Sequence, residues 1–226
     1  MAGRIEGKRV VVTQAEEFMG PATIDLFQSE GAEIIADTSD LTEPEAAAAL
    51  IERAGHVDIL IANLAAPNFF GTKVADLTDD QFTTAFDVMV HPLHRLVRAV
   101  VPQMIARRAG KIVVYGSSVP LRPMARLAAY SAARGAQISY VKSAGAELAR
   151  DNVHLNLIAQ NWVENPAYYP PELQAHPKFK ANLEREVPLG RLAKPHEDAT
   201  FALFLASSES DFFVGQAVPF SGGWAT

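Results

Sequence analysis

Short apolar runs alternate along this chain with longer segments in which apolar residues recur at helical spacing. β-Branched runs at residues 9–13, 32–37 and 57–62 predict strands, and the segments at about 20–29 and 43–54 predict helices between them. The pattern then continues with expected helices at about 78–108, 127–150 and 196–207 and expected strands at 110–115, 153–158 and 217–220. Strands that alternate with helices form right-handed crossovers, so we predict an α/β fold with one doubly wound parallel sheet.

The carboxyl ends of the strands are the place to look for a ligand site in a sheet of this kind. The loops concerned follow Val12, Ala62, Tyr115 and Ile158. The last of them opens a polar and aromatic insertion at about 160–187, which we expect to form one side of the site. We find no internal repeat and no linker, and 226 residues fit one domain, so we expect a single domain over residues 1–226.

Composition removes several classes of function. The formal net charge is −6 and no basic stripe is present, which argues against nucleic acid as a partner. The chain has no cysteine, so disulfides, thiolate metal sites and a cysteine nucleophile are excluded. No run approaches the 18 or so apolar residues of a membrane span, and the charged N-terminus does not resemble a signal peptide. We therefore expect a soluble, cytoplasmic protein that does not bind membranes.

The loop after the first strand, residues 13–20, resembles a dinucleotide-binding loop that has been filled. The order of elements resembles the short-chain dehydrogenase/reductase family, whose pattern here is Thr-Gly-x-x-x-Gly-x-Gly. Gln14 and Phe18 replace two of those three glycines, and only Gly20 remains. The glycines let bare backbone approach the pyrophosphate, so a ring at position 18 obstructs it, and Glu16 and Glu17 add like charge. Phe18 is either core packing or the wall of a small-ligand pocket.

Two other positions complete the comparison with a nucleotide site. Asp37, at the end of the second strand, stands where dinucleotide enzymes bind a ribose hydroxyl, and we interpret it here as a relic or a structural cap. The dehydrogenase pattern has Pro-Gly where this chain has Ala159 and Gln160, a further departure at a cofactor-facing loop. We therefore expect no bound cofactor.

Ser117, Tyr130 and Arg134 form a candidate catalytic set. Ser117 follows the fourth strand, and Tyr130 and Arg134 are four residues apart on the next helix, which places them on one face. A free tyrosine has a pKa near 10, but a neighbouring cation favours the phenolate, and a guanidinium stays charged in any environment. Tyr130 could then serve as a base while Ser117 donates to a substrate oxygen. The alternative is that Tyr130 and Arg134 are an ordinary surface pair.

The triplet, together with Phe18, resembles that of halohydrin dehalogenases, which share the dehydrogenase fold. The usual lysine of the dehydrogenases is replaced here by Arg134, and the resemblance is closest to the B-type members of that group. The resemblance covers nearly the whole chain and includes residues 7–10, 90–95, 111–117, 158–162, 187–192 and 211–226. One departure concerns the support of the arginine, because some relatives carry an acid where this chain has Leu64.

The resemblance implies a Rossmann-like, cofactor-independent and metal-free lyase that converts vicinal haloalcohols to epoxides and also catalyses the reverse opening by small anions. It implies that the alkoxide formed by Tyr130 displaces the halide, which would face Asn161 and the amides of Trp162 and Val163. The implied halide and substrate residues are Phe18, Gln160, Asn161, Trp162, Val163, Tyr168 and Tyr169. The family's assembly implies a homotetramer. An NAD(P)-dependent dehydrogenase and a catalytically silent sensor of this fold remain as alternatives.

Overall fold

A computed structural model describes residues 3–65 and 71–226 and contains one parallel sheet of six strands in the order β2-β1-β3-β4-β5-β6. All pairings between neighbouring strands are parallel. The strands are β1 (Arg9–Val12), β2 (Glu33–Ala36), β3 (Ile59–Asn63), β4 (Gly110–Tyr115), β5 (Val153–Gln160) and β6 (Ala217–Phe220). The predicted doubly wound α/β fold is confirmed.

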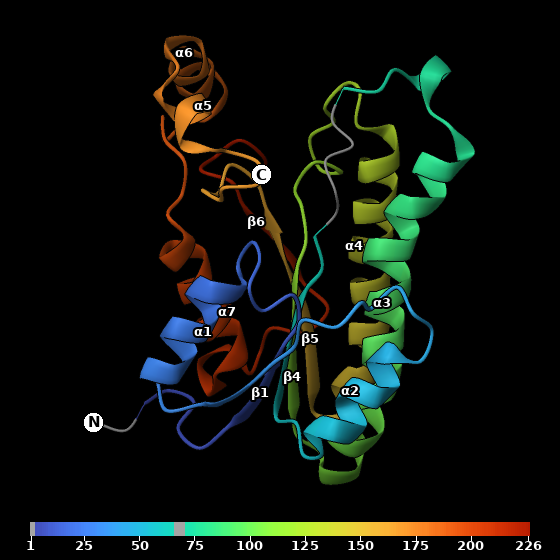
Figure 1. The fold of residues 1–226 in the computed structure, drawn as a ribbon. Helices are drawn as coiled ribbons and strands as arrows, with labels where there is room; N and C mark the ends of the chain where they lie inside the picture. Colours follow the sequence, from blue (N-terminus) through green and yellow to red (C-terminus); the bar gives the residue numbers. More distant parts are fainter. Residues whose placement is uncertain (1–2, 66–70) are drawn as a thin grey trace.

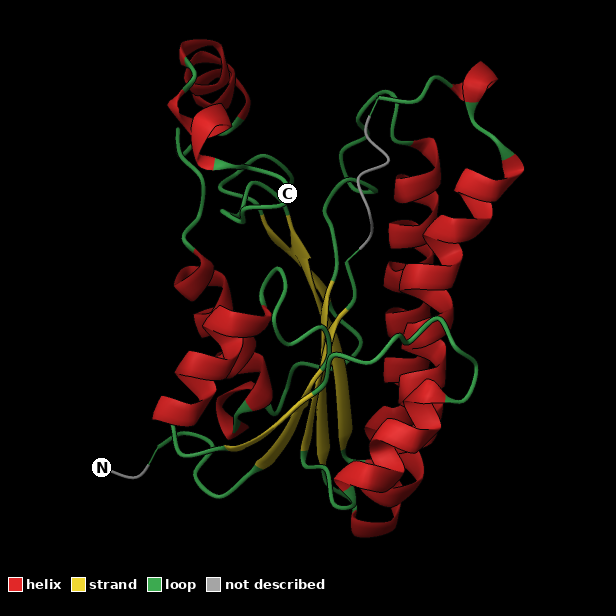
Figure 2. Ribbon diagram, in the orientation of Figure 1, coloured by secondary structure: helices red, strands yellow, loops and turns green. Residues whose placement is uncertain are grey.

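Helices cover both faces of this sheet, so the molecule has three layers (Figures 1 and 2). One face carries α2 (Ala46–Ala54), α3 (Asp79–Arg107) and α4 (Ala128–Leu148), and the other carries α1 (Gly20–Ser29) and α7 (Pro195–Ala206). Single 3₁₀ turns occur at η1 (Val74–Asp76), η2 (Ala149–Asp151) and η3 (Ser208–Ser210). None of the helices in the described residues is long and apolar enough to cross a bilayer.

The central strands are mostly apolar because both faces of the sheet are covered. Every residue of β3 is buried, as are the last four residues of β4. Alternate residues of one strand therefore belong to different cores: Ile112 and Val114 pack toward α3 and α4, whereas Val113 and Tyr115 pack toward α1 and α7. Such continuous apolar runs are typical of parallel sheets.

One feature above the carboxyl edge of the sheet goes beyond the predicted elements. The insertion after β5 contains two helices, α5 (Pro171–Ala175) and α6 (Pro177–Glu186), which lie above the strands in Figure 1. On the other side, α3 runs unbroken through Pro92 and Pro102, starting from a capping box between Thr78 and Gln81. The site described below lies beneath α5 and α6.

Candidate active site

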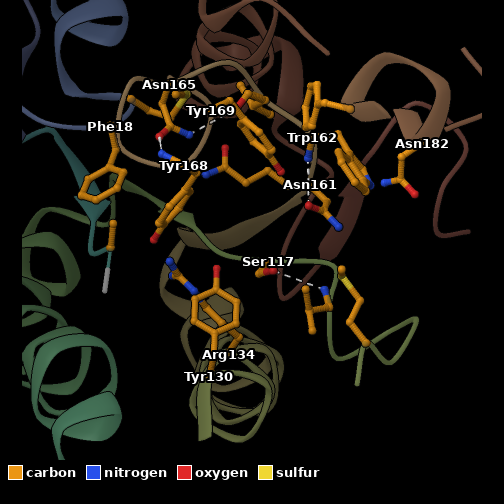
Figure 3. A pocket seen from close by; sticks show the side chains of 17 residues that line it. Phe18, Ser117, Tyr130, Arg134, Asn161, Trp162, Asn165, Tyr168, Tyr169 and Asn182 are labelled. Atoms are coloured by element: carbon orange, nitrogen blue, oxygen red, sulfur yellow. Dashed lines mark hydrogen bonds between the residues drawn. The ribbon is translucent and has the colours of Figure 1, made fainter. Parts of the chain in front are cut away.

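A cavity of about 260 Å³ lies at the carboxyl edge of the sheet, between the loops after β1, β4 and β5 and the start of α4. It is smaller than the roughly 300–1,000 Å³ of sites for drug-sized ligands, which favours a small substrate. All ten predicted catalytic, halide and substrate residues line it: Phe18, Ser117, Tyr130, Arg134, Gln160, Asn161, Trp162, Val163, Tyr168 and Tyr169. Figure 3 shows the hydroxyls of Ser117, Tyr130 and Tyr168 turned toward the same space, with Arg134 beside Tyr130.

Ser117 is placed at the cavity by the end of β4. Its hydroxyl oxygen accepts a hydrogen bond from the Val119 amide at 3.2 Å, which leaves the hydroxyl proton for a ligand oxygen. The chain reaches this point through Gly116, where a Cβ would meet the side chain of Leu157 on β5 at 2.6 Å. Glycine therefore allows the backbone to turn closely over the neighbouring strand and present the serine.

Tyr130 and Arg134 come from the first two turns of α4, and both side chains are largely buried. The guanidinium carbon lies 5.2 Å from the centroid of the Tyr130 ring. Arg134 Nη1 donates to the carbonyl of Tyr115 at 3.0 Å and to Gln137 Oε1 at 2.9 Å, so the position of the guanidinium is fixed by uncharged acceptors. The alternative of an ordinary surface pair does not hold, because Arg134 is only 2% exposed.

The loop after β5 presents hydrogen-bond donors to the cavity. Trp162 adopts a left-handed backbone conformation with φ of 59°, and its amide donates to Asn161 Oδ1 at 2.9 Å. That amide is therefore occupied within the loop, which corrects the expectation that it would face a bound anion. Asn161 Nδ2 and Trp162 Nε1 are buried and have no acceptor among the described residues. The Asn161 amide group points into the cavity in Figure 3.

Tyr168 and Tyr169 close the cavity from above. The ring of Tyr168 packs against Phe18, and the ring of Tyr169 stacks on Trp162 with 6.0 Å between centroids. Burial raises the pKa of Tyr169 far above the usual value, so its hydroxyl stays protonated and cannot act as a base. Asn165 holds this segment, since its Oδ1 accepts from the Tyr168 amide at 2.8 Å and its Nδ2 donates to the carbonyl of Val163.

The loop between β1 and α1 does not fit the pyrophosphate of a dinucleotide. The Gln14 side chain fills the space beside the backbone, where Oε1 accepts from the Ala65 amide at 2.8 Å. Asn63 Nδ2 donates to the carbonyls of Gln14 and Glu17 at 3.0 Å and holds the loop closed. At the start of α1 the Gly20 amide is bonded to the Glu17 carbonyl, and Pro21 has no amide hydrogen. A helix N-terminus depleted of donors is a poor phosphate site.

A second cavity, of about 540 Å³, lies beyond Phe18 and Ala65, which line both cavities. Glu16, Glu17 and Asp40 line it, and none of its described lining residues is a lysine or arginine, so it does not suit a diphosphate. Asp37 at the end of β2 is buried, where it accepts from the Ser39 hydroxyl and pairs with Arg53 at 2.9 Å. Its acceptors are used within the protein, which agrees with the interpretation of Asp37 as structural.

Three residues of the site were absent from the predicted set. Gln137 holds Arg134, Asn165 holds the tyrosine segment, and the Gln14 side chain fills the first loop. Only Asn165 carried a sequence signal, since Asn followed by Pro is typical of a turn in which the asparagine side chain bonds the backbone. Among the described residues, no cluster of three or more histidine, cysteine or acidic side chains could hold a metal ion.

This chain is similar over nearly its whole length to proteins of known family. The family model described as enoyl-(acyl carrier protein) reductase matches residues 3–225. A solved structure described as a dehalogenation enzyme superposes with a TM-score of 0.91 at 32% identity, and the alignment covers 100% of both chains.

Two further relatives are oxidoreductases. Dehydrogenase/reductase SDR family member 4 of Oryctolagus cuniculus is 26% identical over 222 residues, which cover 96% of this chain and 84% of that protein. A gluconate 5-dehydrogenase from Burkholderia cenocepacia J2315, in complex with NADP and tartrate, has a TM-score of 0.89 at 25% identity and covers 98% of this chain and 96% of its own.

Proposed function

This chain belongs to the short-chain dehydrogenase/reductase superfamily, and within it we propose that the protein is a cofactor-independent halohydrin dehalogenase. Its substrates would be short vicinal haloalcohols, and its products an epoxide, a halide ion and a proton. The reverse reaction would open an epoxide with a halide or another small anion.

The proposed reaction begins with the substrate hydroxyl between Ser117 and Tyr130. Tyr130, as phenolate, takes the hydroxyl proton, while Ser117 donates its own proton in a hydrogen bond to the same oxygen. The alkoxide attacks the neighbouring carbon from the side opposite the halogen, so the new carbon–oxygen bond forms as the carbon–halogen bond breaks. The halide leaves with the bonding electron pair. Arg134 stabilises the phenolate electrostatically before the transfer, and proton loss from Tyr130 to solvent restores the base.

The departing halide needs donors in otherwise apolar surroundings, because a bare anion is costly to bury. The side-chain amide of Asn161 and the Val163 backbone amide, which has no acceptor among the described residues, would meet this need. Phe18, Tyr168 and Tyr169 would supply the apolar walls, and Trp162 and Gln160 would complete the lining.

One observation carries the proposal: Phe18, in the loop where a dinucleotide site needs a glycine, lines the cavity in which Ser117, Tyr130 and Arg134 lie together. An intact acid–base set in a space of about 260 Å³ suits chemistry in which no hydride is transferred. The similarity to a solved dehalogenation enzyme over the full chain supports the same conclusion. The rival is an NAD(P)-dependent dehydrogenase, which the similarity to an NADP-bound gluconate dehydrogenase favours.

The proposal is tested by incubating the purified protein, without nucleotide, with a short vicinal bromo- or chloroalcohol and measuring halide and acid together. We expect equal amounts of both, and a loss of at least about a hundredfold in turnover for Tyr130→Phe. Turnover that requires added NAD(P), or a rate unchanged in Tyr130→Phe, would reject the proposal. The expected homotetramer stays a prediction, which light scattering during size-exclusion chromatography would test.

A further inference from the structure

Gln137 is fully buried on α4, and both ends of its side-chain amide are used. Its Oε1 accepts from Arg134 Nη1 at 2.9 Å, and its Nε2 donates to the carbonyl of Met89 on α3 at 2.8 Å. A guanidinium only donates hydrogen bonds and a carbonyl only accepts them, so the amide can lie in one orientation. Only a neutral side chain with a donor and an acceptor at this length serves both neighbours.

The anchor on α3 lies one turn before a proline. Pro92 stands inside α3 and has no amide hydrogen for the carbonyl of Val88, four residues earlier, and Met89 is the next residue after Val88. The Met89 carbonyl is the group that Gln137 binds. Gln137 therefore connects Arg134 to the backbone of α3, which holds the arginine in a fixed position.

The groups that bind Arg134 carry no negative charge. Its two acceptors, the Tyr115 carbonyl and Gln137, are neutral, and Arg134 Nε has no acceptor among the described residues. The described lining of the cavity contains no carboxylate, and Leu64, which follows Asn63 at the end of β3, is buried and uncharged. A buried cation that lacks a fixed counter-ion gains most from a new anion close by, and the ring of Tyr130 is its neighbour.

The other ionisable groups near the pair do not supply that charge. Tyr168 and Tyr169 face it from the loop after β5, and the residues that the loop after β4 contributes to the cavity, Ser117, Val119 and Met124, carry no charge. On α3, Asp87 and His91 are half exposed and bond one another at 2.9 Å. Glu16 and Glu17 line the neighbouring cavity beyond Phe18. Residues 66–70 contain no ionisable side chain.

We infer that Gln137 is a positioning residue that fixes Arg134 against the Tyr130 ring while leaving the arginine charge uncompensated. The inference rests on the proposed function only in naming Tyr130 as the base. It predicts that removal of the amide moves the ionisation of Tyr130, whereas a merely structural buried glutamine would affect stability alone.

The test compares Gln137→Met and Gln137→Glu with wild type and with Asn156→Leu. Asn156 is a matched control because it is a buried amide on β5 that also bonds on both sides, to the Phe213 carbonyl and from the Gln216 amide, and does not line the cavity. Phenolate formation is followed by ultraviolet absorbance as the pH is raised, as the difference between each protein and its Tyr130→Phe counterpart. This readout needs no substrate.

We expect both Gln137 variants to move the Tyr130 transition to higher pH by about one unit or more, Gln137→Met because the arginine is released and Gln137→Glu because its charge is compensated. For haloalcohol turnover, Gln137→Met should lower kcat by about tenfold to a hundredfold with KM nearly unchanged, and Gln137→Glu should recover activity at alkaline pH. Asn156→Leu should lower the Tm without moving the transition.

An unmoved transition in Gln137→Glu, the variant closest in shape to wild type, would overturn the inference, as would a shift of equal size in Asn156→Leu. Failure of the proposed function has a different signature. In that case wild-type protein releases no halide from haloalcohols, while the spectroscopic titration still shows whether Gln137 controls Tyr130.

Discussion

The ring of Phe18 packs against the ring of Tyr168 with 5.3 Å between their centroids and 45° between their planes. One ring comes from the loop after β1 and the other from the insertion after β5, so the contact joins two separate segments that line the substrate cavity. Phe18 holds its place in a left-handed backbone conformation, with φ of 48°, which is rare for a residue with a large side chain. The proposed reaction assigns this contact the role of a wall between the halide site and the neighbouring cavity.

Removal of the Phe18 ring should widen the site and weaken the binding of small substrates. We expect Phe18→Ala to lower kcat/KM for a two- or three-carbon haloalcohol by about tenfold, mostly through KM, and to favour bulkier substrates. The matched control is Phe82→Ala, which removes a partly exposed ring on α3. Steady-state kinetics over substrates of increasing size would check this, and an unchanged size preference in Phe18→Ala would contradict it.

Ser117 and Ser118, the two serines after β4, allow a direct comparison of a hydroxyl inside the cavity with one outside it. The hydroxyl of Ser117 lines the cavity, whereas the hydroxyl of Ser118 is buried without a partner among the described residues and does not line it. Ser117→Ala should lower kcat/KM by about a hundredfold, because a donor to the developing alkoxide is lost. Ser118→Ala should leave it within about twofold and preserve the fold. Equal losses in both variants would argue for a packing effect.

Two neighbouring acids on α7 predict opposite effects of pH on stability. Asp198 is fully buried with neither oxygen bonded to a described residue, and burial raises its pKa well above the usual value. The folded state therefore binds this proton more tightly than the unfolded chain, so stability is lost as the pH rises above the unfolded pKa near 4 and toward the folded value. Asp198→Asn should raise the Tm at pH 8 by a few degrees and change it little at pH 4.

Glu197 is the control of opposite sign. The hydrogen bonds from the Arg191 side chain and the Lys194 amide hold its pKa at about 2. Its contribution is present above the unfolded pKa and is lost as the pH falls toward 2. Glu197→Gln should therefore lower the Tm at pH 7 and have a smaller effect near pH 3. The same sign of pH dependence in both variants, measured by differential scanning calorimetry, would contradict this account.

Much of the fold could be predicted from sequence because its determinants are local. The bounds of β4, β6 and α1 agree with the predicted ranges, since apolar β-branched runs and helical spacing are readable within a single segment. The helices α5 and α6 escaped prediction for a physical reason. Each begins with a proline in its first turn, and Leu183 is the one buried residue of α6. Such short and mostly polar helices contain few apolar residues from which a helix can be predicted.

Some residues of the candidate site could be predicted from sequence and others could not. Ser117, Tyr130 and Arg134 were predictable because a fixed strand-to-helix spacing brings them together. The role of Gln137 was not, because it depends on a carbonyl of α3 that lies 48 positions earlier in the chain. The same holds for the Trp162 amide, which the neighbouring Asn161 side chain occupies, a detail of loop geometry that spacing does not determine.

The central claim is that a small anion, and not a nicotinamide coenzyme, occupies the space between Phe18 and the catalytic set. Anomalous diffraction from crystals grown with both bromide and NADP tests it most directly. We predict a bromide ion within hydrogen-bonding distance of Asn161 Nδ2 and the Val163 amide, and no nucleotide along residues 13–20. NADP seated against that loop, with its nicotinamide beside Tyr130, would contradict the account.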